Sequence, residues 1–141
     1  MSESIFASEG ESFPVLPSPA LAHRLSGNFP EYVAEAPVLR EGDGYLKGYH
    51  VLKTSSLTSE LAREVVSVLT DPVNYGDRGR GAMCFFPGFG FTFGEGQNSV
   101  VALVCLECSW VMFYSGQGLQ SIVPSPAGEA RLRALYERVV A

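Results

Sequence analysis

The apolar and polar residues between positions 44 and 73 form two successive patterns. Residues 45–52 alternate with the two-residue period of a strand. A helical pattern follows, in which Thr58 can cap the first turn and Pro72 blocks any continuation. The apolar residues of this helix recur at the spacing of one helix face: Leu61, Val65, Val68 and Leu69. We therefore expect a strand and then an amphipathic helix over about residues 58–70.

Short apolar runs dominate the second half of the chain. They cover residues 82–86, 89–93, 99–107, 109–114 and 119–123, and residues typical of turns separate most of them. The third and fourth runs have no Gly or Pro between them, so one long bent strand is an alternative to two strands. Tight connections between successive strands require antiparallel pairing.

The chain ends in a second helical pattern. Ser125 is a preferred cap residue and Pro126 a preferred first residue of a helix. One face of the pattern is apolar and contains Leu132, Leu135, Tyr136 and Val139. We expect this helix over about residues 126–140. The predicted fold class is α+β, in which an antiparallel sheet of five or six strands packs one face against two amphipathic helices.

The first part of the chain lacks a clear period and is interrupted by prolines, at Pro14, Pro17, Pro19, Pro30 and Pro37. We expect residues 1–10 to be disordered and residues 11–43 to wrap irregularly around the core, with a short helix around residues 21–25. Residues 44–141 then form the α+β core of a single domain that spans residues 1–141.

The composition is typical of a compact protein, and the net charge limits which kinds of partner we expect. Of the 141 residues, 46% are hydrophobic and 18% are charged, and the formal net charge is −5. This acidic balance argues against nucleic acid as a partner, because nucleic-acid binders need a basic face. The longest apolar run, residues 100–106, is too short for a membrane helix, and no signal-peptide pattern precedes it. We therefore expect a cytoplasmic protein that does not enter a membrane.

Three cysteines are the candidates for special chemistry: Cys84, Cys105 and Cys108. They could hold zinc, with His50, His23, a carboxylate or water as the fourth ligand. In an undisturbed strand Cys105 and Cys108 would face opposite sides, and they converge only if the chain bends near Glu107 and Cys108. Buried thiols that pack as small hydrophobes are the first expectation. A zinc site is the second, and a disulfide or redox pair is the third.

The spacing of the cysteines also resembles that of a known group of proteins. From about residue 49 onward, the chain resembles a group of small uncharacterised bacterial proteins with a Cys-aromatic-x-Pro-x-x-Gly element followed by Cys-x-x-Cys. These elements read CFFPGFG from Cys84 and CLEC from Cys105. The resemblance implies a shared fold and shared cysteines. The group often has an arginine and then a histidine after the proline, but Gly88 and Phe89 stand here, which weakens a metal role.

A further pattern is typical of RNA-recognition strands, whose aromatic residues at alternate positions stack on bases. Residues 88–93 read GFGFTF, and Phe89 and Phe91 would be the stacking residues. The acidic charge and the order of strands argue against this function. The alternative is a strand whose phenylalanines pack under a helix.

No hydrolase, metalloprotease, P-loop or dinucleotide motif occurs in the sequence. The leading hypothesis is therefore a non-catalytic protein-binding module, of the kind that immunity proteins and inhibitors represent, which neutralises a basic partner. The polar loop at residues 74–81 and the wrapping N-terminal segment are its candidate surfaces. A small zinc- or thiol-site protein is the alternative function, and RNA binding is a second alternative. The oligomeric state stays open.

Overall fold

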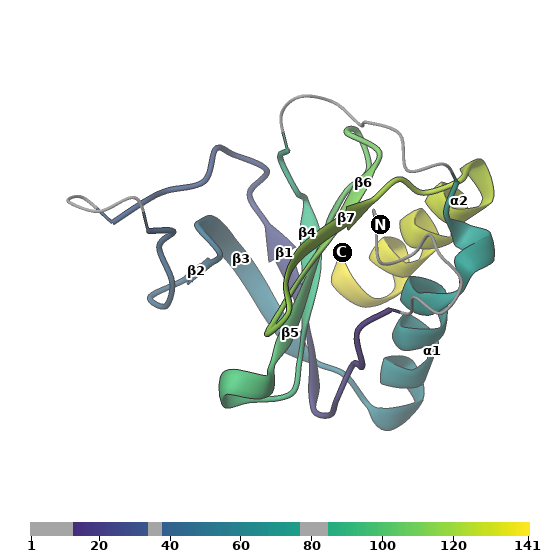
Figure 1. Ribbon diagram of the computed structural model, residues 1–141, viewed down its shortest axis with the longest axis horizontal. Helices are drawn as coiled ribbons and strands as arrows, with labels where there is room; N and C mark the ends of the chain where they lie inside the picture. Colours follow the sequence, from purple (N-terminus) through teal and green to yellow (C-terminus); the bar gives the residue numbers. More distant parts are fainter. Residues whose placement is uncertain (1–12, 34–37, 77–84) are drawn as a thin grey trace.

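The computed structural model describes residues 13–33, 38–76 and 85–141, and in these residues one antiparallel sheet of seven strands packs against two helices (Figure 1). The strand order is β2-β3-β1-β4-β5-β6-β7. The strands are β1 (Ala20–Leu25), β2 (Tyr45–Leu46), β3 (Tyr49–Ser56), β4 (Phe89–Phe93), β5 (Val100–Cys105), β6 (Trp110–Ser115) and β7 (Gly118–Ile122). The predicted α+β class is confirmed, and the predicted five or six strands are too few.

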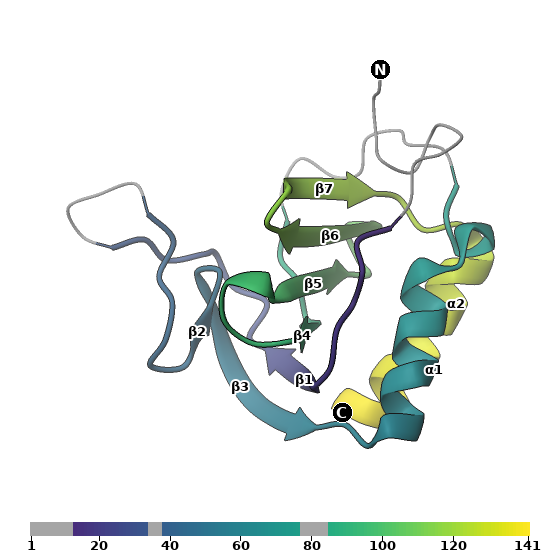
Figure 2. The ribbon, with the colours of Figure 1, turned by 60° about the horizontal axis from the view of Figure 1, so that its bottom comes forward.

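The two helices lie side by side on one face of the sheet, which curls as it extends toward β3 (Figure 2). Helix α1 spans Ser59–Thr70 and α2 spans Pro126–Leu135, after which a π-helical turn, η3, continues over Tyr136–Val140. The Thr58 Oγ1 atom accepts a hydrogen bond from the Leu61 N–H at 3.2 Å, and the Ser125 Oγ atom accepts one from the Gly128 N–H at 3.0 Å. Both predicted helices and both predicted caps are therefore confirmed. Among the described residues, no helix is long and apolar enough to cross a membrane.

The main core lies between the helices and the sheet, and the phenylalanines of β4 form its centre. Phe89, Phe91 and Phe93 are 2%, 0% and 0% exposed. Side chains alternate along a strand, so these three share the face that the helices cover. Each ring contributes roughly 1.5–3 kcal/mol by its burial. These phenylalanines pack under the helices, as the alternative to RNA binding predicted, and rings buried in this way offer no face on which a base can stack.

The N-terminal segment differs most from its prediction. Strand β1 lies in the interior of the sheet, where it pairs with β3 on one side and β4 on the other. We expected an irregular segment with a short helix at residues 21–25, because the ALAHRL sequence is rich in helix-forming Ala and Leu. Pairing on both edges overrides this weak local preference. The expected disorder of residues 1–10 falls outside the described residues.

Two further strand predictions need correction. The strand expected at residues 45–52 is a hairpin, in which Lys47 and Gly48 form the two-residue turn with φ values of 52° and 88°. Positive φ at both turn residues suits the twist of a β-hairpin. For the strand expected at residues 82–86, residues 85–86 have no regular structure and the remainder lies outside the described part of the chain.

Residues 28–33 and 38–46, which we name the arm, project from the sheet on the side away from the helices (Figures 1 and 2). Backbone hydrogen bonds hold its segments together, including Glu31 N–H to Gly48 O at 2.7 Å and Arg40 N–H to Glu31 O at 2.9 Å. The Glu31 carboxylate also accepts hydrogen bonds from the Arg40 guanidinium and the Tyr45 hydroxyl. The arm is therefore an internally bonded extension.

Candidate functional site

The turn between β5 and β6 brings Cys105 and Cys108 together as a disulfide. Strand β5 ends at Cys105 and β6 begins at Trp110, so four residues make the connection. Ser109 adopts the left-handed conformation, with φ of 58°, and its N–H donates to the Leu106 carbonyl oxygen at 3.2 Å. The chain thus bends where the sequence required it, and two strands, not one long bent strand, occupy residues 99–114.

The disulfide is buried but close to a surface pocket. Cys105 and Cys108 are 2% and 7% exposed, and the Cys108 N–H donates to the Cys105 Sγ atom at 3.2 Å. We expected these residues first as free buried thiols. Their burial is confirmed, but the free-thiol interpretation is wrong for this pair, because a turn at this position lets the two sulfurs meet.

A pocket of about 560 Å³ opens beside this turn. Residues of β1, β4, α2 and η3 complete its lining. Cys105, Leu106 and Glu107 line it from the turn, and Phe89 lines it from β4. Its other charged lining residues are Arg24, Arg133 and Glu137. Among the described lining residues, two arginines and two glutamates balance in formal charge. This volume falls in the range of pockets that hold small ligands.

The sequence did not indicate the arginines of this pocket. Arg24 lies on β1, the strand that the sequence pattern did not predict. Arg133 lies in α2, and Tyr136 follows one turn later at the start of η3. A helical pattern alone does not reveal which end of the sheet these side chains face. Of the pocket residues, only Cys105 and Phe89 stood out as candidates from sequence.

The predicted zinc ligands are not brought together among the described residues. Cys84 lies outside those residues, and Cys105 and Cys108 are bonded to each other, whereas zinc binds thiolates. His50 lies on β3, separated from β5 by β1 and β4. In the described part of the chain, no group of three His, Cys, Asp or Glu side chains is arranged to hold a metal ion. The zinc site at Cys84, Cys105 and Cys108 stays a prediction.

His23 is a hydrogen-bonded structural residue on the face of the sheet opposite the helices. It is 7% exposed, its Nδ1 atom lies 2.9 Å from Thr54 Oγ1, and its Nε2 atom lies 2.8 Å from Thr92 Oγ1. Desolvation by burial lowers the pKa of His23 below its ordinary value. The neutral imidazole therefore links β3, β1 and β4.

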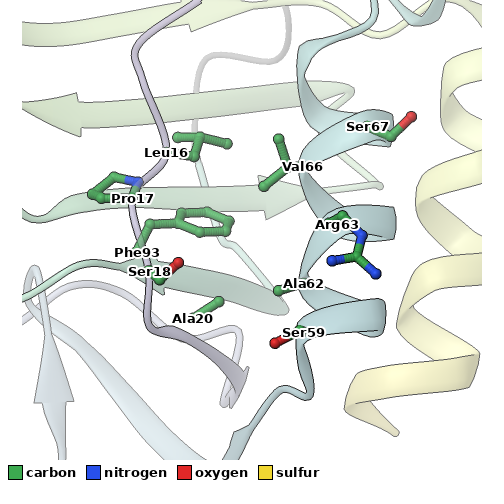
Figure 3. A pocket seen from close by; sticks show the side chains of 10 residues that line it. All are labelled: Leu16, Pro17, Ser18, Ala20, Ser59, Ala62, Arg63, Val66, Ser67 and Phe93. Carbon is green, nitrogen blue, oxygen red and sulfur yellow. The ribbon is translucent and has the colours of Figure 1, made fainter.

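A second pocket, of about 460 Å³, lies between α1, β4 and the segment that leads into β1 (Figure 3). Leu16, Phe93 and Val66 line it with apolar surface, and Arg63 is the one charged residue among the described residues that line it. These described residues offer a binding surface and no pair of groups for general acid and base catalysis.

The sequence predicted two candidate surfaces for a protein partner, the polar loop at residues 74–81 and the N-terminal segment, and they differ in how much apolar surface they expose. Asn74 and Tyr75, at the start of the predicted polar loop, are 2% and 9% exposed, and residues 77–81 lie outside the described part. The arm, in contrast, exposes four large apolar side chains: Phe29, Tyr32, Val33 and Val38. The arm is therefore the better-supported surface.

No family model matches the sequence, and the searches of curated proteins and of solved structures gave no match either. The resemblance to the group of small bacterial proteins stays a prediction.

Proposed function

We propose that the protein is a non-catalytic protein-binding module that docks on a basic partner through the arm, as an inhibitor or immunity-type protein does. The observation that carries the proposal is the exposure of the arm's apolar side chains. Phe29, Tyr32, Val33 and Val38 are 73%, 56%, 48% and 54% exposed. Exposed apolar residues that gather on one segment are typical of interaction sites, and aromatic residues are enriched among those that contribute most to binding.

The internal bonding of the arm supports the same function. The Glu31 carboxylate joins Arg40 and Tyr45, and the Arg40 guanidinium lies 4.2 Å from the centre of the Tyr45 ring. The hydrogen bond to Glu31 raises the pKa of the Tyr45 hydroxyl, so the phenol remains a donor. At the base of the arm, the Phe29 and Phe86 rings meet edge to face at 4.9 Å. A surface that is already ordered loses less entropy when it binds.

Charge supports a basic partner. The chain carries a formal net charge of −5, and an acidic protein attracts basic proteins over distances longer than any contact. The described charged residues of the arm and its hairpin turn largely pair with one another, as in the Glu41–Lys47 ion pair. We therefore assign affinity to the apolar side chains of the arm and faster association to the overall charge.

The test combines an arm variant with a matched control. Tyr32→Ser with Val38→Ser removes apolar surface from the arm. Leu119→Ser with Val73→Ser removes similarly exposed side chains, at 57% and 61%, from β7 and the short helix η1. Proteins captured by the unaltered protein are purified and titrated by calorimetry with it and with both variants.

We expect the arm variant to weaken binding about 30-fold or more, and the control to change it less than about threefold. Association should also slow as salt is added. The proposal is wrong if each captured partner binds both variants equally. It is also wrong if sedimentation shows that the arm instead joins two copies of this chain.

A further inference from the structure

We propose that the Cys105–Cys108 disulfide is a thiol–disulfide exchange site that oxidises a small dithiol while the protein stays folded. The inference is independent of the arm and of any protein partner. It rests on the position of the disulfide in the turn between β5 and β6, on the hydrogen bond to one of its sulfurs, and on the pocket beside it.

The disulfide stabilises the fold less than one that closes a long loop. It joins residues only three positions apart, and a disulfide that closes so short a loop removes little entropy from the unfolded chain. The hairpin around it has other support. Strands β5 and β6 pair from Val101 with Tyr114 to Cys105 with Trp110, and the Ser109 hydroxyl donates to the Glu129 carboxylate of α2. The turn can therefore persist when the sulfur–sulfur bond is broken.

The two sulfurs have different surroundings. The Cys108 N–H already donates to Cys105 Sγ, at 3.2 Å, and a hydrogen bond of this kind stabilises a thiolate more than a thiol. Cys108, at 7% exposed, is the more accessible residue of the pair. Exchange proceeds by attack of a thiolate on one sulfur while the other leaves. The hydrogen bond makes Cys105 the better leaving group, so attack falls on Cys108, which does not itself line the pocket and is reached there across its bond to Cys105.

The reaction is balanced with a dithiol as the reductant. A thiolate of the dithiol attacks Cys108 Sγ, the sulfur–sulfur bond breaks, and its electron pair goes to Cys105 Sγ. The second thiol of the dithiol then loses its proton and attacks the first, which releases the Cys108 thiolate. The dithiol loses two electrons and two protons and becomes a cyclic disulfide, and both protons end on the two cysteines.

The pocket defines the class of substrate. Its volume of about 560 Å³ holds a molecule no larger than a short peptide, and Cys105, Leu106 and Glu107 place the turn along one side of it. The described lining residues include two arginines and two glutamates, and this balance favours neither an anionic nor a cationic substrate. An uncharged small dithiol fits these properties, and dithiothreitol is a suitable probe.

The first experiment follows the redox state of the native protein. In a Cys84→Ser background, the protein is equilibrated with mixtures of reduced and oxidised dithiothreitol, approached from both directions, and free thiols are counted by alkylation and mass spectrometry. We expect reversible interconversion with an unchanged circular dichroism spectrum and a rate that low urea does not alter. Reduction that occurs only as fast as the protein unfolds, or a dithiol form that the oxidised reagent cannot reoxidise, would overturn the proposal.

The second experiment tests the order of attack. In the same background, Cys105→Ser leaves Cys108 as the only thiol, and Cys108→Ser leaves Cys105, so the two variants are controls for each other. We expect the pH dependence of alkylation by iodoacetamide to give the Cys105 thiol the lower pKa of the two, because the N–H of residue 108 donates to it. Equal pKa values, or a lower value at Cys108, would contradict the assignment of Cys105 as the leaving sulfur.

Discussion

Gly128 provides a sharp test of the fold, because sequence and structure predict opposite effects for its replacement by alanine. It lies in the first turn of α2, where it is buried against the backbone of Asn74. A Cβ atom at this position would lie 2.6 Å from the Asn74 carbonyl carbon and 3.0 Å from its Cα atom. Asn74 cannot move freely, because its carbonyl oxygen accepts from the Ser125 N–H and its side-chain oxygen from Arg131.

The magnitude follows from three effects. Alanine in place of glycine in a helix stabilises a protein by up to about 1 kcal/mol. Forcing a methyl group against a fixed backbone costs about 1–3 kcal/mol, and weakening the Ser125–Asn74 hydrogen bond costs about 1 kcal/mol. The gain in helix propensity offsets only the lost hydrogen bond. We therefore expect Gly128→Ala to lower the free energy of unfolding by about 1–3 kcal/mol.

Urea unfolding, followed by circular dichroism, measures this change. Gly116→Ala is the matched control, because a Cβ atom there meets nothing within 4 Å and the glycine has no positive φ. We expect this control to change the stability by less than about 0.5 kcal/mol. A Gly128→Ala variant as stable as the parent, or more stable, would refute the predicted packing of α2 on Asn74.

Three more outcomes are expected. Because burial lowers the pKa of His23, the unfolded chain binds a proton more readily. Stability should then fall by up to about 1.4 kcal/mol per pH unit as pH drops from about 6.5 toward the lower folded pKa. Urea titrations across this pH range should find that the stability of His50→Gln still depends on pH in this way. The stability of His23→Gln should not. Phe91→Ala should cost about 3–5 kcal/mol in thermal and urea unfolding, whereas Phe29→Ala, on the exposed arm, should cost less than about 1 kcal/mol. Replacing Cys105 and Cys108 together by serine should lower the free energy of unfolding by about 2 kcal/mol without altering the dichroism spectrum, and a loss of fold would contradict the minor structural role of the disulfide.

The helices could be predicted from sequence because each is encoded locally. Thr58 and Ser125 satisfy the first N–H groups of their helices, and Pro72 follows one end, so caps and period agree. The strands in the second half of the chain, β4 to β7, could also be predicted, because turn residues separate their apolar runs. These signals do not depend on which strand pairs with which.

Strand β1 could not be predicted in this way, because its conformation depends on distant partners. His23 is polar, yet it lies in the sheet with Thr54 from β3 and Thr92 from β4 as its hydrogen-bond partners. Ala22 is a helix former, yet it packs in the core opposite Phe91. Such pairings form between residues as far apart in the chain as Ala20 and Phe93, and a local pattern contains no information about them.

Only part of the candidate site could be predicted from the sequence, because the rest of it also depends on distant parts of the chain. The spacing of Cys105 and Cys108 indicated a pair, but their meeting required the left-handed Ser109, which is not a residue that favours that conformation. The pocket beside them draws Arg24 and Arg133 from elements far apart in the chain. Neither arginine belongs to a motif, so only the folded chain identifies them.

Site-specific photo-crosslinking tests whether the arm is the surface that binds a protein partner. A photoreactive phenylalanine analogue is placed at Tyr32 on the arm or at Leu119 on β7, two positions of nearly equal exposure. We expect a crosslink from position 32 to one basic protein, and none to that protein from position 119. Crosslinking to the same proteins from both positions, or from neither, would show that the arm is not the binding surface.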